Sequence, residues 1–214
     1  MNRACLPELL DSLPPDHPEA LRNRRDLRII NRFTGSRAWF ARVLPPLLRP
    51  GESVLELGAG MGELGRALIA EGIPVDGLDL WPRPQGWPAE RAWHQGDLTT
   101  FEGYGAYPVV IGNLILHQFT DEQLGALGRK LRPSARVLLA CEPERLRRSQ
   151  VIMAAVAPLF RASRVTLHDA HVSVQGGFRG DELPRALGLG EGGWDFSCRT
   201  TALGVNRMVA VRRP

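Results

Sequence analysis

VLELGAGMGELGRAL, residues 54–68, places glycines at alternate positions 58, 60 and 62, directly after a short apolar run. A glycine loses more backbone entropy on folding than other residues, so a cluster of glycines needs a local reason. Either the backbone adopts a positive φ angle, or a ligand lies so close to the main chain that a Cβ atom would collide with it. The stretch therefore predicts a strand, a ligand-binding turn and the start of a helix.

The residues before this stretch predict an N-terminal helical cap. Apolar residues recur at helical spacing from Pro18 to about Val43, and Gly35 divides this run into two helices. Residues 1–15 are interrupted by prolines, which predicts irregular or weakly helical structure. A cluster of prolines and a glycine at 45–51 marks a boundary. We therefore divide the chain into a cap, residues 1–50, and a main domain, residues 51–214.

After the boundary, short apolar runs alternate with helical segments. Helices are expected at about 63–71, 121–131 and 149–160, and strands at 53–57, 75–79, 91–94, 108–112, 136–141, 194–200 and 204–211. This alternation is typical of βαβ units, so it predicts an α/β fold with a mostly parallel sheet covered on both faces. The last two strands are separated by a few turn-like residues and predict an antiparallel pair at one edge.

The charge pattern argues against a nucleic-acid partner. The formal charge is +4 and the sequence pI is about 9.5, but Lys130 is the only lysine and the arginines are scattered. A nucleic-acid-binding protein is expected to carry a dense basic stripe. We therefore interpret the basic residues as a solvated surface.

The cysteines and the apolar stretches predict a soluble, cytoplasmic protein. Cys5, Cys141 and Cys198 are far apart, which favours neither a zinc site nor a disulfide framework, and a reducing compartment fits them best. The N-terminus lacks the charged-then-apolar pattern of a signal peptide, and the longest apolar stretches are too short to span a bilayer.

The glycine loop follows the first strand of the main domain, at the edge of the sheet where open α/β folds bind ligands. A dinucleotide fingerprint needs a small residue where this chain has Glu63, and a phosphate loop needs a Gly-Lys-Ser/Thr ending that is absent. The loop is therefore not built for a pyrophosphate. Glu56, two residues before the first glycine, would repel phosphates and suits a ligand with an ammonium group.

The pattern E-x-G-x-G-x-G resembles the first motif of the class I S-adenosylmethionine (SAM)-dependent methyltransferases, and the resemblance extends over residues 53–142. It implies a Rossmann-like fold with a seven-stranded sheet, and SAM as the cofactor. It implies that Asp79 binds both ribose hydroxyls and that Asp97 meets the adenine amine, with Leu98 alongside the ring. NLILHQF, residues 113–119, matches the motif that follows the fourth strand. The implied cofactor-binding residues are Glu56, Gly58, Ala59, Gly60, Gly62, Asp79, Leu80, Asp97, Leu98, Asn113 and Leu114. An unrelated Rossmann-like domain is the alternative.

Several acceptor classes lack their motifs in this chain. The Asn-Pro-Pro-Tyr motif of enzymes that methylate exocyclic amines is absent, and so is a Pro-Cys nucleophile, which leaves Cys141 as a small core residue. Metal-dependent catechol enzymes carry carboxylates directly after the fourth strand, where this chain has Asn113. We therefore expect no metal, and we expect Asp121 to cap the next helix.

Histidines are the expected bases. His117 follows the fourth strand, and an imidazole with a pKa near neutrality can take a proton from a phenol or a carboxylic acid. The alternative is a histidine that hydrogen-bonds the backbone and shapes the pocket. His168 and His171, with Asp169 between them, lie in the segment that commonly lines the acceptor pocket in the family. Asp169 could orient one of them as a base, or all three are solvated loop residues.

The flanks carry a second resemblance. RDLRIINRFTG and HDAHVSVQGGFRGDELPRAL are similar to segments of small bacterial methyltransferases of polyketide or quinone-type aromatic metabolism. This implies a hydroxylated aromatic or polyketide-like small molecule as acceptor, and O-methylation. Phe33, Trp39 and Phe40 either form the roof of an apolar pocket or are the buried face of the cap. An RNA or protein methyltransferase and a SAM-binding regulator without catalysis remain alternatives.

Overall fold

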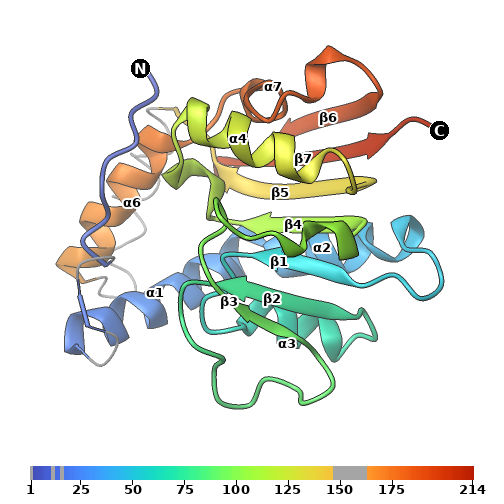
Figure 1. Cartoon of the computed structure of the whole chain (residues 1–214). Helices are drawn as coiled ribbons and strands as arrows, with labels where there is room; N and C mark the ends of the chain where they lie inside the picture. Colours follow the sequence, from blue (N-terminus) through green and yellow to red (C-terminus); the bar gives the residue numbers. More distant parts are fainter. Residues whose placement is uncertain (1, 11–12, 15–16, 147–162) are drawn as a thin grey trace.

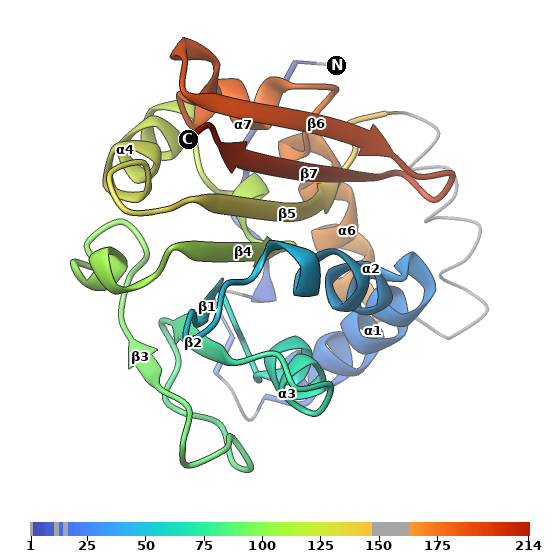
Figure 2. The same cartoon turned by 90° about the vertical axis from the view of Figure 1, so that its right-hand side faces the viewer.

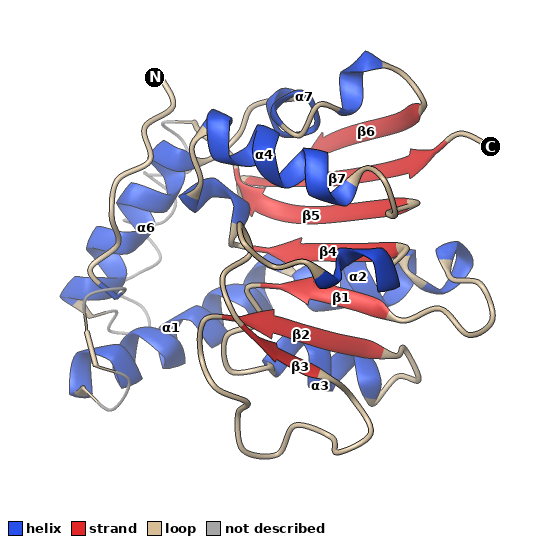
Figure 3. Ribbon diagram, in the orientation of Figure 1, coloured by secondary structure: helices blue, strands red, loops and turns tan. Residues whose placement is uncertain are grey.

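The structure is a computed structural model that describes residues 2–10, 13–14, 17–146 and 163–214. Within these residues, seven strands form one sheet in the order β3-β2-β1-β4-β5-β7-β6 (Figures 1 and 3). The strands are β1 Val54–Leu57, β2 Val75–Asp79, β3 Trp93–Gln95, β4 Val109–Asn113, β5 Val137–Pro143, β6 Trp194–Thr200 and β7 Val205–Arg212. Strands β1 to β5 are parallel, and β7 is antiparallel to both β5 and β6. The predicted fold class, with its antiparallel pair at one edge, is confirmed.

The described helices surround this sheet. They are α1 Pro18–Thr34, α2 Ser36–Val43, α3 Glu63–Ile69, α4 Asp121–Leu131, α6 Arg164–Gly176 and α7 Glu182–Ala186, with 3₁₀ turns η2 Pro45–Leu47, η3 Gly103–Ala106, η4 Leu116–Gln118 and η6 Leu189–Glu191. Gly35 adopts a left-handed conformation with φ of 67° between α1 and α2, which confirms the predicted division. The helix expected at 149–160 lies outside the described residues. Helices α6 and α7 were not predicted.

Apolar side chains cover both faces of the sheet, as the continuous apolar strands predict. Alternation sends Leu55 and Leu57 of β1 to one face, where α4 and α7 pack, and Val54 to the other. Figure 2 shows α4 on one side of the sheet and α2 and α3 on the other. Trp39 and Phe40 of α2 are buried against this second face, so they are core residues and not the roof of a pocket. The Phe33 side chain lies outside the described part of the chain.

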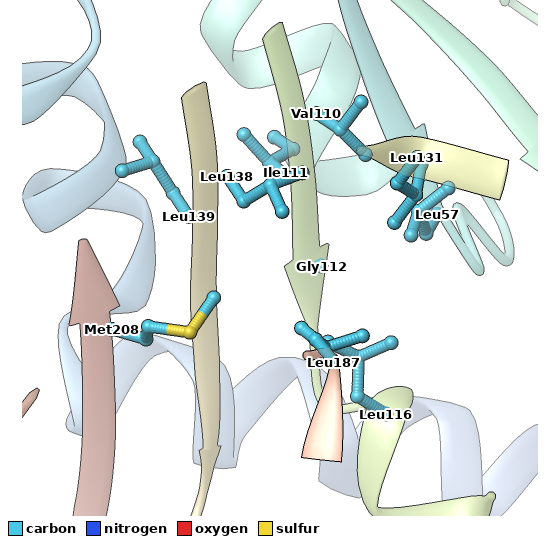
Figure 4. Close-up of a pocket in the computed structure, with 10 residues that line it drawn as sticks. All are labelled: Leu57, Val110, Ile111, Gly112, Leu116, Leu131, Leu138, Leu139, Leu187 and Met208. Carbon is cyan, nitrogen blue, oxygen red and sulfur yellow. The ribbon is translucent and has the colours of Figure 1, made fainter. Parts of the chain in front are cut away.

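A small cavity remains inside the core (Figure 4). Every residue that lines it is apolar: Leu57, Val110, Ile111, Gly112, Leu116, Leu131, Leu138, Leu139, Leu187 and Met208. We interpret it as a packing void between the sheet and its helical layer, because it offers no polar group that would orient a ligand.

Helices α1 and α6 and the N-terminal segment lie beyond the carboxyl ends of the parallel strands (Figure 1). The contact between α1 and α6 is polar at its centre. Asp26 of α1 is fully buried and accepts hydrogen bonds from the Ser163 backbone N–H (3.0 Å) and the Thr166 hydroxyl (2.8 Å). Asn23, one turn earlier, donates to Asp169 of α6 at 3.2 Å. None of the described helices is long and apolar enough to cross a membrane.

Candidate functional site

The loop after β1 contains three glycines in the left-handed region, with φ of 61° at Gly58, 56° at Gly60 and 68° at Gly62. At Gly58 a Cβ atom would collide with the side chain of Ile115, and at Gly62 it would lie 2.6 Å from Trp87. A Cβ at Gly60 would meet no atom within 4 Å. Gly58 and Gly62 are therefore required by packing within the protein, whereas Gly60 faces open space where a ligand can approach the backbone.

Asp79, the last residue of β2, fastens this loop. Its Oδ2 accepts a hydrogen bond from the Gly60 N–H at 2.7 Å, and its Oδ1 accepts one from the Trp81 N–H at 2.9 Å. Burial raises the pKa of this carboxyl above its ordinary value, against the two backbone hydrogen bonds. Each carboxylate oxygen keeps a further acceptor site, so a ribose diol can still bind here. These two hydrogen bonds give Asp79 a role in the turn, and the predicted ribose contact remains a prediction.

Glu56 of β1 is the most unusual charged residue of this region. It is 3% exposed, and its Oε2 has no hydrogen-bond partner in the described structure. Burial raises the pKa of the Glu56 carboxyl to about 8, and the nearby Asp79 charge acts in the same direction, against a hydrogen bond from the Gly65 backbone. A buried carboxyl with an unpartnered oxygen is costly, so it points to a ligand that supplies a positive charge.

The residues expected around the adenine differ in how much of their side chains is exposed to solvent. Asp97 is exposed, and its Oδ1 accepts from the backbone N–H and the hydroxyl of Thr99, both at 2.7 Å. The Leu98 side chain is 4% exposed and belongs to the core, so it does not lie open beside a ring. Leu80, directly after Asp79, is instead 63% exposed, and Met61 of the glycine loop is 42% exposed. These two offer apolar surface next to the loop, and Met61 was missed by the motif because that position is variable in it. Ala59 is buried within the loop.

The chain is strained where β4 ends. Leu114 is the only described residue other than glycine with a positive φ, at 57°. This conformation costs a residue with a Cβ roughly 1–2 kcal/mol, and such strain tends to occur at functional sites. Leu114 donates its backbone N–H to the Cys141 carbonyl at 2.9 Å, which holds it beside β5. Asn113 and Leu114 thus lie at the carboxyl end of β4, which pairs with β1, and their predicted contact with the cofactor remains a prediction.

Glu142 of β5 organises the turn that follows. This carboxylate is fully buried and accepts hydrogen bonds from the backbone N–H groups of Ile115 (3.1 Å), Leu116 (2.9 Å) and His117 (3.3 Å). Glu142 is not part of any of the predicted motifs, although a glutamate directly after the apolar run VLLAC was a signal in the sequence.

His117 is enclosed by two carboxylates. Its Nδ1 lies 2.7 Å from Glu142 Oε2 and its Nε2 lies 3.3 Å from Glu8 Oε1. Burial alone would lower the pKa of the imidazole, but the hydrogen bonds and charges of Glu142 and Glu8 outweigh it and raise the pKa to about 9. Glu8 was also missed, because nothing in an irregular N-terminal segment marks one acid among several.

The other predicted histidines lie on α6, not in a loop. His168 is 46% exposed along its side chain, with Nδ1 3.2 Å from Asp169 Oδ1. His171 is exposed, and its ring contacts Gln175 one turn later at 2.8 Å. Asp169 is mainly occupied with the N-terminal segment, because it accepts from the Leu9 N–H at 2.8 Å and the Leu10 N–H at 3.2 Å. The structure therefore does not gather the three histidines into one cluster.

Two minor predictions concern Cys141 and Asp121. Cys141 is fully buried in the core, as expected, and burial raises the pKa of its thiol to about 12. The cap of α4 is Thr120, which forms a capping box with Gln123, so the expected role of Asp121 as the cap was wrong. Asp121 instead pairs with Arg3 at 2.6 Å. In the part of the chain that the structure describes, no three His, Cys, Asp or Glu side chains gather to hold a metal ion.

Comparison with solved structures places this arrangement among known folds. The plantazolicin methyltransferase BpumL, solved in complex with SAH, superposes with a TM-score of 0.73 over 96% of this chain and 93% of its own, at 10% identity. The related BamL, also solved with SAH, superposes with a TM-score of 0.74 over 96% and 93% of the two chains, at 10% identity. This is the methyltransferase fold. Magnesium protoporphyrin IX methyltransferase (ChlM) from Synechocystis PCC 6803, solved with SAM, gives a TM-score of 0.55 and 19% identity over 89% of this chain and 84% of its own.

Sequence comparison alone does not reach these proteins. No protein-family model matches the chain, and no curated protein matches it. At 10–19% identity the neighbours establish the methyltransferase fold of this chain, while its cofactor and chemistry have to be argued from the site.

Proposed function

We propose that this chain is a SAM-dependent methyltransferase that acts on a small-molecule acceptor without a metal. The observation that carries the proposal is the unpartnered, buried Oε2 of Glu56 beneath a glycine loop whose Gly60 faces open space. A cationic ligand that also lies against the backbone satisfies both features, and SAM carries an ammonium group and a sulfonium.

The residues of this chain fit the parts of the cofactor. Glu56 would balance the ammonium group, Gly60 would admit the cofactor to the backbone, and Asp79 would accept hydrogen bonds from the ribose hydroxyls. Leu80 and Met61 present apolar surface for the adenine. Asp97 follows β3 at the same carboxyl edge of the sheet. When bound, SAM supplies an activated methyl carbon on sulfur, so much of the acceleration can come from holding an acceptor in line with it.

We further propose that the acceptor is a hydroxyl group of an aromatic or polyketide-like compound. The support is the resemblance of the flanking segments, together with the absence of the motifs that mark base and metal-dependent catechol methylation. The scattered arginines give an RNA acceptor no basic stripe to bind. The solved neighbours BpumL and ChlM carry the names of plantazolicin and a porphyrin, so a larger acceptor is the competing possibility.

Calorimetry with SAH tests the cofactor, and transfer of a labelled methyl group from SAM tests the reaction. We expect micromolar or tighter binding of SAH, and label transfer to members of a panel of phenols and hydroxylated naphthalenes. Absence of SAH binding would overturn the proposal, because every part of it depends on the cofactor. Binding without transfer to the panel, but with label in added total RNA or protein, would replace the small-molecule acceptor. Binding with no transfer to any of these would favour a regulator.

A further inference from the structure

We propose that His117 is a positioning residue: its buried imidazolium joins Glu142 of the sheet to Glu8 of residues 2–10, here called the strap, and so holds the strap over the acceptor side of the site. The proposal rests on the proposed methyltransferase function only in that it assumes an acceptor at this edge of the sheet. The junction itself is a statement about the fold.

Both ring nitrogens of His117 face carboxylates. The Nδ1···Glu142 distance is 2.7 Å and the Nε2···Glu8 distance is 3.3 Å, while the imidazole is 4% exposed. An ionised carboxylate only accepts hydrogen bonds, so each ring nitrogen has to donate, and an imidazole that donates from both nitrogens is protonated. Such a ring has no lone pair left to take a proton from an acceptor.

The surrounding charges support the protonated form. The pKa of His117 is raised to about 9, because the hydrogen bonds and charges of the two glutamates outweigh burial. The pKa of Glu8 is lowered: burial would raise it, but hydrogen bonds from His117, Ser173 and Gln118 outweigh that effect. Glu142 of β5 and Glu8 of the strap are the charged groups at the ring. Arg3 and Cys5 of the strap contact the backbone carbonyl of His117, and Arg3 also pairs with Asp121 of α4.

Polar contacts hold the strap, and several of them meet at this junction. Glu8 also accepts from the Ser173 hydroxyl at 2.5 Å and from the Gln118 amide at 3.2 Å. Arg3 donates to the carbonyls of Phe119 (2.6 Å) and Gly176 (2.8 Å), and so connects η4 to the end of α6.

The strap is therefore bound both to α6 and to the turn after β4. Since polar contacts depend on geometry more than apolar packing does, loss of one charged partner is expected to loosen the whole segment.

The junction lies at the carboxyl edge of the sheet, where the proposed acceptor would bind. His117 is in η4, which follows the strained Leu114 at the carboxyl end of β4, and Glu142 holds the backbone of the same turn. The strap passes along α6 beyond the carboxyl ends of the parallel strands (Figure 1). A strap that moves away would uncover this edge of the sheet, so the junction acts on the acceptor through the strap and not by touching the proton that is lost.

Nitrogen NMR of the histidine rings and hydrogen exchange test the junction without an acceptor. We expect both ring nitrogens of His117 to show protonated-type shifts from pH 6 to pH 8, assigned by their loss in His117→Gln. We expect exchange at the amides of Ala4, Leu9 and Leu10 to rise at least tenfold in His117→Gln and in Glu8→Gln. The double variant should be no faster than the faster single variant, because both remove one junction.

His94→Gln is the matched control, since His94 hydrogen-bonds Tyr107 on the far part of the sheet and does not touch the strap. Exchange within twofold of wild type in both junction variants, or a ring nitrogen of His117 that is unprotonated at pH 7, would overturn the proposal. Failure of wild-type protein to bind SAH would sink the methyltransferase function while leaving these results standing.

Kinetics separates positioning from base catalysis for any phenol that wild type methylates. Positioning predicts that His117→Gln and Glu8→Gln each raise the acceptor KM at least fivefold and change kcat less than threefold. A base predicts a loss of kcat of about 10²–10⁴-fold in His117→Gln alone, with Glu8→Gln close to wild type. That second pattern would refute the positioning role.

Discussion

The three glycines of the loop after β1 share one backbone conformation but differ in what surrounds them. Gly58 and Gly62 are crowded by Ile115 and Trp87, whereas Gly60 borders open space. The sequence predicts the loop because glycine spacing is a local signal. It does not predict which glycine meets the ligand, because the crowding side chains come from residues that are distant in sequence.

Gly60→Ala should therefore separate folding from binding. The new Cβ meets no protein atom, so the cost to stability is only that of a left-handed alanine, about 1 kcal/mol. We expect calorimetry to show at least a tenfold loss of SAH affinity. Gly51→Ala is the matched control, because Gly51 has φ of 82° with nothing within 4 Å and lies in the turn before β1. Equal SAH affinity in the two variants would contradict a ligand at Gly60.

The raised pKa of Glu56 predicts that cofactor binding is linked to the release of a proton. With a pKa of about 8 its carboxyl is mostly protonated at pH 7, and a bound ammonium group favours the ionised form. Binding of SAH should therefore release close to one proton at pH 7, and the affinity should rise by up to about tenfold per pH unit from pH 6 to 7.5. Calorimetry in buffers of different ionisation enthalpy measures this release. Glu56→Gln should release none, and a pH-independent affinity in wild type would show that Glu56 does not meet the cation.

The raised pKa of Glu56 also makes the stability of the folded protein depend on pH. The Glu56 carboxyl keeps its proton in the folded protein, whereas the unfolded chain gives up this proton near pH 4.5. Glu56 therefore favours the folded state most below that pH. The contribution of Glu56 to stability then falls as the pH rises towards 8. A ligand that ionises the group in place removes this penalty, which is a reason for the cofactor-bound protein to be the more stable form at neutral pH.

Among the elements, those with regular apolar periods were predicted well. The α4 helix was predicted at its observed bounds, and the seven strands were predicted to within two residues at each end. Helix α6 was missed because its buried face includes Thr166 and Asp169 beside valines, so the apolar period is broken. These polar residues are buried because Asp26 and the strap supply their partners, and such partners from distant parts of the chain are invisible to a local pattern.

Two glycines in neighbouring elements predict opposite responses to alanine. At Gly112 of β4 a Cβ would lie 3.4 Å from Ile115 and Leu116, an ordinary contact beside the core cavity. Gly112→Ala should stabilise the protein by about 0.4–1 kcal/mol, since it also removes freedom from the unfolded chain. At Gly128 of α4 the Cβ would collide with the Leu187 carbonyl oxygen.

Gly128→Ala should therefore destabilise by about 1–3 kcal/mol despite the better helix propensity of alanine. Urea unfolding of the two variants and wild type measures both values. A loss of stability in Gly112→Ala would mean that the cavity wall cannot accept a methyl group, and a gain in Gly128→Ala would mean that α4 can shift away from α7.

At the scale of the whole molecule, the alternation of strands and helices predicts the parallel pairing of β1 to β5. The sequence predicts the part of the candidate site that lies at the strand ends, from Glu56 to Leu114, and the cofactor contacts of these residues remain predictions. Glu8 and Glu142 were not predicted, because they are assembled around His117 from segments 109 and 25 residues away. The acceptor side of the site is thus mostly a tertiary property.

Strand β7 is an interior strand, hydrogen-bonded to β5 on one side and β6 on the other. A chain that stops at residue 203 should therefore lose cooperative unfolding in calorimetry, because β6 loses its partner and β5 becomes an open edge. A chain that stops at residue 212 is the control. It loses the exposed Arg213–Asp195 ion pair, which contributes at most about 1 kcal/mol, and one backbone hydrogen bond from Arg213 to Gly193, so its unfolding should stay cooperative. Cooperative unfolding of the shorter chain would show that β7 is dispensable.

The position of β7 late in the sequence also determines how long one edge of β5 stays unpaired during synthesis. The ribosome completes β5 at Pro143, but the strand that covers its free side is complete only at Arg212, 69 residues later. At about 5–20 residues per second this leaves roughly 3–14 s in which the edge of β5, with Val137 and Leu139, has no partner. The nascent chain is most open to misassociation during that interval, so slow translation or delayed chaperone release over residues 144–212 should affect its yield more than the same delay earlier.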